Sequence, residues 1–329
     1  MKRAMLLLRR RAISSIPVLL IVIVFTFLLL ESASGDAVDA YLVSIGGGDA
    51  ALVQSLRQSY GLDQGMATRL WLYFSALLRF DLGWSVAFDR PVLGLILERL
   101  PNTLLLMGSA TALSFCLGSL LGIVAGARPD SFRDRFLSIG SLLLYAIPGF
   151  WLGLVLVIVF AVNLRWLPTS GIETIASGKQ GLARAMDIGK HLILPVSALG
   201  FIYLALFLRV MRAGMVETWR MDFVLFARSK GLSRLRIVLR HVARNALLPL
   251  VTVLGLQSAA MLGGSVVIES VFAIPGFGRL AQEAVNGRDA PLLMGIIIVS
   301  AVSVIFVNLV VDIAYAFLDP RVGASEAGA

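Results

Sequence analysis

The chain has 329 residues, of which 58% are hydrophobic and 15% charged, and its 29 lysines and arginines outnumber its 20 aspartates and glutamates by nine. Soluble domains are usually about half apolar and about one-quarter charged, so this composition excludes an ordinary soluble domain and a disordered chain. An excess of basic residues can indicate a nucleic-acid partner, but in an apolar chain it can also mark the side of a bilayer on which loops lie. The positions of the charged residues along the chain must distinguish between these two possibilities.

Six long stretches contain no aspartate, glutamate, lysine or arginine, and each is long enough to cross a hydrocarbon core of about 30 Å as a helix. The first could instead be a secretory signal, but its 19 residues exceed the usual apolar region of about 7–15, which favours a retained anchor. We predict membrane helices at about residues 12–30, 100–127, 136–164, 191–208, 246–268 and 290–318.

The segments between these stretches alternate in charge. Residues 1–11 carry five basic residues and no acid, and residues 209–244 carry nine basic residues against two acids. Residues 31–98 instead hold eight acids against four arginines. Although residues 165–190, with four basic residues and two acids, go mildly against the trend, the positive-inside rule places both termini, including the tail 319–329, in the cytoplasm. The basic excess therefore reports membrane topology, and no nucleic-acid partner is expected.

The outer segment 31–98 carries two apolar patterns with helical spacing, the first ended by Gly61. Two amphipathic helices that rest on the outer membrane face and a docking surface for an external partner fit these patterns equally. The first pattern consists of Leu52, Val53, Leu56 and Tyr60, and the second of Leu70, Phe74, Leu77 and Leu78.

The cytoplasmic segment 209–245 predicts a short amphipathic helix between Trp219 and Lys230, with Gly231 as its stop and Ser233 as the N-cap of the next helix. A partner can push a helix that is held on the cytoplasmic side of the membrane. The same arginines could instead only anchor the loop to anionic headgroups. Composition alone leaves these alternatives open.

The order of residues in segment 209–245 distinguishes between a helix that a partner pushes and a loop that only anchors to headgroups. The stretch from Ala227 to Ser233, with Arg240-His241 and Arg244-Asn245 after it, resembles the EAA coupling loop of ABC importer permeases. The loop resembles the form found in the dipeptide, oligopeptide and nickel permease family. Leu225 and Phe226 stand where the general consensus of the loop has Glu-Ala. Further similar motifs are Asp81-Leu-Gly83 with Ser85, Pro101-Asn-Thr103, Trp166-Leu-Pro-Thr-Ser-Gly171, Val271 to Leu280, Arg288-Asp289 and Asp319-Pro-Arg321.

The resemblance implies an all-α membrane protein of the ABC type I importer permease fold, with six helices and a core permease domain at residues 99–318. It implies a first-subunit permease that pairs with a second homologous permease subunit. Two ABC ATPases that bind ATP and Mg²⁺, an external solute-binding protein and a place in the bacterial inner membrane are implied as well. Contact with the ATPases is implied for Glu217, Asp222, Ala227, Lys230, Gly231, Arg240, His241, Arg244 and Asn245.

No motif in the sequence supplies chemistry of its own. Gly178-Lys179 and Gly189-Lys190 lack the following Ser or Thr of a phosphate-binding loop, and no catalytic or metal-ligating pattern occurs. We therefore expect no catalytic residue, no metal ligand and no cofactor bound by this chain. The alternative to an importer subunit is a self-contained secondary carrier or channel, which would transport without an ATPase. Polar or bending residues inside the spans are candidates for the pathway or gate: Pro148, Gln257, Ser258, Ser265, Asn308 and Asp312, of which Asp312 fits a partner for a cytoplasmic arginine better than a substrate contact.

Overall fold

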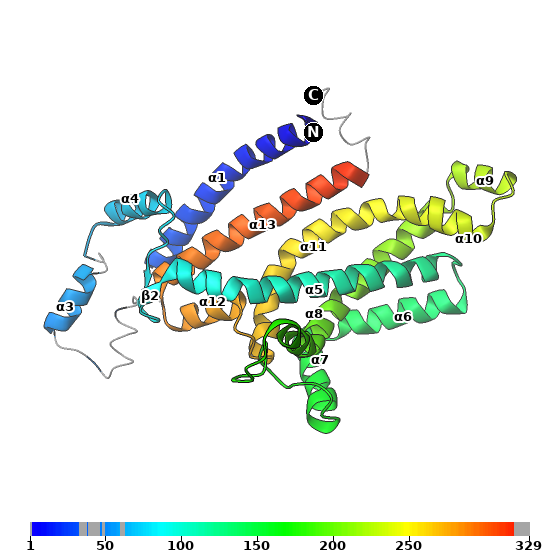
Figure 1. Cartoon of the computed structure of the whole chain (residues 1–329). Helices are drawn as coiled ribbons and strands as arrows, with labels where there is room; N and C mark the ends of the chain where they lie inside the picture. The colour runs from blue at the N-terminus through cyan, green and yellow to red at the C-terminus, as the bar shows by residue number, and fades with distance from the viewer. Residues whose placement is uncertain (1, 33–37, 39–46, 48–49, 60–62, 319–329) are drawn as a thin grey trace. The chain divides into compact units, whose positions relative to one another are not determined.

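The computed structural model describes residues 2–32, 38, 47, 50–59 and 63–318, apart from some side chains within helices. These residues are mostly helical (Figure 1) and divide into two compact units. The larger unit is built on Thr103–Ile274, and it includes α13 from Val307 onward. The smaller unit is built on Met5–Asn102 together with Pro275–Phe306. Each unit has its own apolar core.

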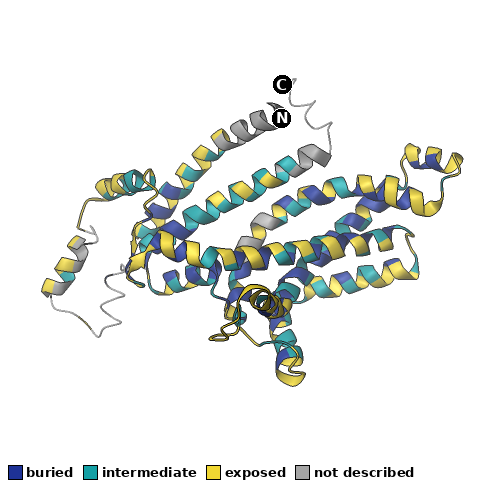
Figure 2. Ribbon diagram, in the orientation of Figure 1, coloured by how far each residue is buried: buried dark blue, intermediate teal, exposed yellow. Residues whose placement is uncertain are grey.

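The larger unit is arranged around α8, which packs against α6, α7 and α11. In the most apolar stretch of α8, 61% of the residues are buried, compared with 17% in α13, and Figure 2 shows the same contrast. Its elements are the second part of α5 (Val92–Gly126), α6 (Phe132–Ala146), α7 (Gly149–Leu156), the π-helix η1 (Val157–Asn163), α8 (Gly181–Thr218), α9 (Asp222–Ser229), α10 (Arg234–Ile237), the π-helix η2 (Val238–Val242) and α11 (Ala243–Val271).

The smaller unit joins α1 to a short ladder and two later helices. In the ladder, β1 pairs antiparallel with β2, so that Trp84 lies opposite Pro91 and Ser85 opposite Arg90. Apolar side chains of α1 and α4 pack around Met294 of α13. Its elements are α1 (Lys2–Ser32), α3 (Ala50–Ser59), α4 (Met66–Leu77), β1 (Trp84–Ser85), β2 (Arg90–Pro91), the start of α5, α12 (Phe277–Asn286) and the first part of α13 (Ala290–Leu318).

Five of the described helical segments are long and apolar enough to cross a membrane, and a bent pair brings the number to six if it forms one span. That pair is α6 with α7 and η1, and its two parts meet at 98°. Pro148 causes the break, because it lacks an N–H and favours an extended residue before it. Ile147 is indeed extended, with ψ 126°. The sequence predicts one helix bent at Pro148, whereas the structure has two separate helices there.

Several helices extend beyond the charge-free stretches that predict them. The 38 residues of α8 correspond to about 57 Å of helix, roughly twice the thickness of the hydrocarbon core. The charged residues in its first and last turns can therefore lie outside the membrane without ending the helix. The absence of charge in a sequence locates the part within the membrane, whereas local capping decides where the helix ends.

The second amphipathic pattern of the outer segment is partly confirmed. Leu70, Phe74 and Leu77 of α4 pack against the α1 and α13 side chains of the smaller unit. Leu78 does not belong to this face: α4 ends at Leu77 and the Leu78 side chain is 85% exposed. The first pattern coincides with α3, but Tyr60 and Gly61 and the side chains of Leu52 and Leu56 lie outside the described residues.

Candidate functional site

The short helix α9 is the centre of the coupling segment, which we define as residues 217–245. Its charges agree with the helix dipole, because Asp222 lies in its first turn and Arg228 in its last turn. It lies outside the candidate membrane spans found in the described parts of the chain. The structure therefore has a separate short helix at this position, as the sequence predicts.

Gly231 ends α9 in a Schellman motif. Its N–H donates to the Arg228 carbonyl at 2.9 Å, and the Leu232 N–H donates to the Ala227 carbonyl at 3.3 Å. This pair of bonds requires a residue with positive φ, and Gly231 has φ +70°. Ser233 is the N-cap of α10 as predicted, but its side chain makes no capping hydrogen bond.

The two faces of α9 differ in burial although both are apolar. Val224 and Ala227 point inward and are 1% and 5% exposed. They belong to a core formed with α8, α10, η2 and α11. Leu225 and Phe226 point outward and are 69% and 61% exposed. These two residues replace the Glu-Ala of the general loop consensus, and they form the outer face of α9.

Eight of the nine residues expected to contact the ATPases are exposed or half-buried, and Ala227 is the exception. The Lys230 ammonium lies 4.5 Å from the centre of the Phe226 ring, which adds a positive charge beside the outer face. The Asn245 amide donates to the His241 carbonyl at 2.7 Å. The structure thus brings Lys230 to the outer face of α9, whereas Ala227 serves the packing beneath it.

The coupling segment is also bound to the C-terminal end of α5. The indole N–H of Trp219 donates to the Gly126 carbonyl at 2.9 Å, and the Arg234 guanidinium donates to the Ala127 carbonyl at 2.9 Å. The last carbonyls of a helix lack partners within the helix, so donors from elsewhere are favourable there. The guanidinium groups of Arg228 and Arg234 lie 5.2 and 5.8 Å from the centre of the Trp219 ring.

An ion pair with a buried carboxylate joins α6 to α8 in the same region. Asp134 is only 1% exposed, and its carboxylate accepts two hydrogen bonds from Arg212, one of them at 2.7 Å. The same carboxylate accepts the Asp130 N–H at 2.9 Å and the Ser138 hydroxyl at 3.3 Å. Its charge is therefore fully paired where α6 begins.

Three glycines spaced by four residues form the contact of α5 with α8. A Cβ added at Gly118, Gly122 or Gly126 would lie 2.5–2.7 Å from the Cβ of a large side chain on α8. Small residues at this spacing let two membrane helices approach closely. This seam reaches the end of α5 at which Trp219 and Arg234 bind.

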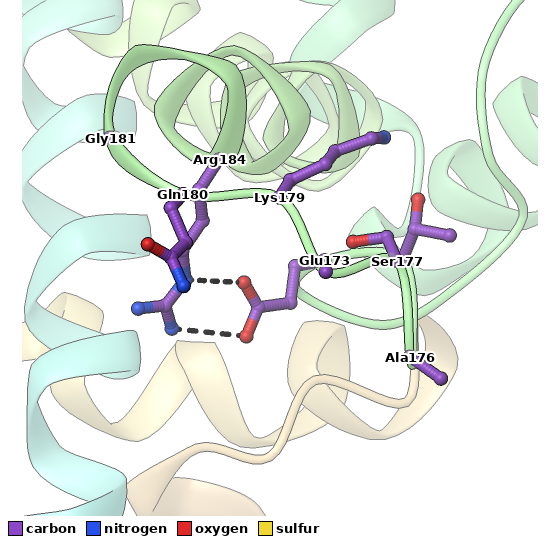
Figure 3. A pocket seen from close by; sticks show the side chains of 9 residues that line it. Glu173, Ala176, Ser177, Lys179, Gln180, Gly181 and Arg184 are labelled. Carbon is purple, nitrogen blue, oxygen red and sulfur yellow. Dashed lines mark hydrogen bonds and ion pairs between the residues drawn. The ribbon is translucent and has the colours of Figure 1, made fainter.

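The other end of α8 carries residues 165–187, which the charge pattern predicts to lie outside and which we call the outer loop. Asp187 accepts the Thr174 N–H at 2.6 Å, the Thr174 hydroxyl at 3.0 Å and the Lys179 ammonium at 2.5 Å. Glu173 accepts two hydrogen bonds from Arg184, at 2.6 and 3.0 Å (Figure 3). This charged partner holds the pKa of the Glu173 carboxyl below its ordinary value. A polar pocket of about 300 Å³ lies over these residues.

The outer loop and the coupling segment lie far apart within the larger unit. Asp187 and Trp219 are separated by 32 positions along α8, which corresponds to about 48 Å along a helix. This distance exceeds the roughly 30 Å of a hydrocarbon core. The two regions can therefore lie on opposite sides of a membrane.

Several motifs of the family resemblance meet in space. In the smaller unit, the buried Asp289 carboxylate accepts the Ser85 hydroxyl at 2.6 Å and the Leu292 N–H at 3.0 Å. There, too, the Asn102 amide donates to the Pro275 carbonyl at 2.8 Å. In the larger unit, the Thr103 hydroxyl donates to the buried Glu269 carboxylate at 2.6 Å. These motif residues hold the scaffold together.

The residues predicted to line a pathway or gate lie at several places in the larger unit. Pro148 is the N-cap of α7. On α11, Ser265 is fully buried and Gln257 half-buried, and Asn308 on α13 is half-buried. The side chains of Ser258 and Asp312 lie outside the described part of the chain. The assignment of these residues to a pathway stays a prediction.

With the geometry of both ends of α8 established, comparison with known proteins identifies the chain. Residues 118–324, more than half of the chain, match the family described as "Binding-protein-dependent transport system inner membrane component". The chain belongs to this family. It is a multi-pass permease of the ABC importer type, as the resemblance of its coupling loop predicts.

Relatives cover almost the whole length of this permease. The oligopeptide transport system permease protein AppB of Bacillus subtilis (strain 168) is 36% identical, over 95% of this chain and 98% of that protein. A protein of Brucella abortus (strain 2308), named for a peptide transport system permease, is 37% identical over 96% of this chain and 98% of that protein. A solved structure of the MetNI methionine ABC transporter shares the fold, with a TM-score of 0.55 at 15% identity over 69% of this chain and 97% of that chain.

Sequence reasoning missed four residues of the permease that fasten the coupling segment or its surroundings. The sequence marks Asp134, Arg212 and Arg234 only by their charge, and Trp219 only as the start of the short amphipathic helix. Ser131 followed by Asp134 is a capping pattern that predicts the start of α6, and the Ser131 hydroxyl does accept the Asp134 N–H at 3.3 Å. The partner of each residue lies 78 or more positions away in the sequence, and no local pattern identifies it.

Proposed function

We propose that this permease is one subunit of an ATP-driven, binding-protein-dependent importer for peptides or a related small solute. It forms half of the translocation pathway with a second homologous permease subunit, and six helices span a bacterial inner membrane with both termini in the cytoplasm. Two ABC ATPases hold the ATP and Mg²⁺, and a solute-binding protein delivers cargo on the outer side. Peptide cargo is carried over from the names of the relatives.

The observation that carries this proposal is the apolar outer face of α9. Leu225 and Phe226 are exposed on a helix that lies outside the candidate membrane spans, and the opposite face of the same helix is anchored in a core. Exposed apolar anchors beside a positive charge suit a pocket on a protein partner. The outer loop, about 48 Å away along α8, then faces the solute-binding protein.

The test is to give the outer face of α9 a charge. Leu225→Asp and Phe226→Asp are purified with the second permease subunit and the ATPases, and the amount of ATPase that co-purifies is measured. Each variant should weaken ATPase binding about tenfold or more, because a buried interface anchor contributes at least 1.4 kcal/mol. Binding-protein-stimulated uptake in proteoliposomes should fall in parallel.

A matched control lies at the opposite end of α8. Ile175 in the outer loop is 92% exposed, so Ile175→Asp makes the same chemical change far from α9. It should leave ATPase binding unchanged. Normal ATPase binding by both α9 variants would overturn docking on this face. Uptake by the permease chain without any ATPase would replace the importer with a secondary carrier or channel.

A further inference from the structure

Two side chains connect the coupling segment to the end of α5, a helix that is distant from it in the sequence. Trp219 precedes α9 and Arg234 follows it, yet they donate to the consecutive carbonyls of Gly126 and Ala127 at the end of α5. Both sides of α9 are therefore bound to one helix end. We call Trp219 and Arg234 the α5 clasp.

The clasp also contacts α9 directly. The Arg228 guanidinium of α9 lies 5.2 Å from the centre of the Trp219 ring, and the Arg234 guanidinium lies 5.8 Å from it. The ring is half-buried and packs on the core that holds the inner face of α9. The Trp219 side chain therefore contacts both helices: its ring lies near Arg228 of α9, and its N–H donates to the end of α5.

Directional contacts matter here because they hold one particular group against another. Burial of apolar surface is itself non-directional. A hydrogen bond from a charged guanidinium and one from an indole lose their strength when their geometry changes. The α5 clasp therefore adds directional contacts between the α5 end and the residues that flank α9, whereas the glycine seam holds α5 against α8.

We propose that Trp219 and Arg234 are positioning residues that make the C-terminal end of α5 move together with α9. A displacement of α9 then reaches α5 through the clasp, in addition to its covalent path into α8 and α11. The glycine seam carries the motion of the α5 end along the helix, because α5 and α8 touch through backbone-close contacts there. This inference rests on the proposed docking of the ATPases on α9.

The first test measures coupling in the complete importer complex reconstituted with its binding protein and a peptide cargo. Trp219→Phe keeps an aromatic ring but removes the N–H donor, and Arg234→Gln removes the charge. Since residues along a coupling route alter coupling by about 0.5–2 kcal/mol, each should lower the transport-to-ATP ratio about threefold and the double variant about tenfold. Arg234→Lys, which keeps a cation, should retain more than half of the ratio.

Controls separate this role from simple stability. Arg236→Gln removes a neighbouring exposed arginine of α10 and should leave the ratio unchanged. ATPase co-purification should be the same for all variants, because the outer face of α9 is untouched. An unchanged ratio in the Trp219→Phe, Arg234→Gln double variant would overturn the inference and leave the proposed function intact. Absence of ATP-driven uptake by the unmodified complex would instead overturn the proposed function.

A second test follows the motion itself. Spin labels at Arg128→Cys, just after α5, and at Ser229→Cys, at the end of α9, occupy exposed positions, and Cys116→Ser removes the native thiol. The distance between the labels should stay constant when the ATPases bind and hydrolyse ATP, and it should change in the clasp double variant. A change of this distance with the clasp intact, during active transport, would show that α5 and α9 move separately and would overturn the inference.

Discussion

The two ends of α8 are held by different kinds of interaction. At the coupling end, apolar side chains from α8, α9, η2 and α11 form one core. The polar contacts there are the Asp134–Arg212 ion pair and a hydrogen bond from Trp219 to the end of α5. At the outer end, Leu167 and Ile172 also pack against an apolar core, but the carboxylates of Glu173 and Asp187 hold the rest of the loop through hydrogen bonds to its own residues. The coupling segment is thus held mainly by packing, and residues 173–187 mainly by charged groups.

This difference suits the two tasks of the proposed importer. A close-packed core has low compressibility, so a force on α9 displaces its neighbours without being absorbed. The Glu173–Arg184 pair of the outer loop is largely exposed, and exposed ion pairs contribute only about 0.2–1 kcal/mol each and are screened by salt, so this part of the loop can rearrange against a partner. The coupling end transmits a displacement, whereas the outer end can adapt to a docking protein.

The two organising aspartates offer the strongest test of this comparison. Asp134→Asn would place an amide N–H₂ against the Arg212 guanidinium. Because the Arg212 side chain is 32% exposed, the loss should be smaller than the roughly 3–5 kcal/mol of a fully buried pair, at about 2 kcal/mol. The Asp187 side chain is also buried, at 8% exposure, but Asp187→Asn still leaves an oxygen that can accept the Thr174 N–H, and its other partner, Lys179, is 40% exposed. We expect a loss of about 1 kcal/mol in the second case.

Thermal unfolding of the purified permease in detergent measures this contrast. Asp134→Asn should lower the melting temperature about twice as much as Asp187→Asn, because Asp134 accepts two hydrogen bonds from one guanidinium. Trypsin should cleave after Lys179 faster in Asp187→Asn than in the unmodified protein, because the carboxylate no longer holds that side chain. Equal melting temperatures for the two variants would contradict the distinction between a packed end and a charged loop.

Two glycines with similar backbone geometry allow the ends to be compared without a difference in packing. Gly231 and Gly178 have φ +70° and +64°, and an added Cβ would meet nothing within 4 Å at either position. Alanine should therefore cost about 1–2 kcal/mol of backbone strain at both. Gly231→Ala should lower the transport-to-ATP ratio, because it disturbs the end of α9, whereas Gly178→Ala should leave the ratio unchanged. An equal effect of both variants on this ratio would remove the special role of α9.

Local chemistry explains why the sequence predicts α9 well. A glycine that needs positive φ, an acid in the first turn and a basic residue in the last turn lie within ten positions, so Gly231, Asp222 and Arg228 mark the helix without any tertiary contact. The apolar spans are predictable for the same reason, since charge excludes a residue from the hydrocarbon. The break at Pro148 follows from the missing N–H of proline, although its angle of 98° does not.

The contacts that position α9 could not be predicted in this way. The sequence assigns the arginines of the coupling segment a single property, their charge, and so it does not distinguish Arg234, which binds a helix end, from Arg236. Trp219 is apolar enough for a core and polar enough for a hydrogen bond, and only the three-dimensional path of α5 decides which carbonyl it meets. The four-residue spacing of Gly118, Gly122 and Gly126 is a sequence signal for the close packing of α5 against another helix, but it does not identify that helix.

The smallest expected effect concerns pH and salt at the outer loop. Arg184 holds the pKa of Glu173 below its ordinary value, which is about 4.3 for an unperturbed glutamate. A lowered pKa in the folded protein means that the ion pair adds stability above the ordinary pKa and loses it as the pH falls through the folded-state pKa. A spin label at Ser177→Cys, in the Cys116→Ser background, should therefore keep constant mobility from pH 7 down to the ordinary glutamate pKa of about 4.3, and become more mobile only below it. Glu173→Gln should give the mobile spectrum already at pH 7. A salt concentration of 1 M should shift the unmodified loop towards the same spectrum, because the screening length then falls to about 3 Å.

A label at Ser229 in α9 is the control. Its mobility should respond to none of these changes, since α9 is held mainly by packing. Equal responses at both sites would show that charge, and not the kind of contact, governs both ends of α8.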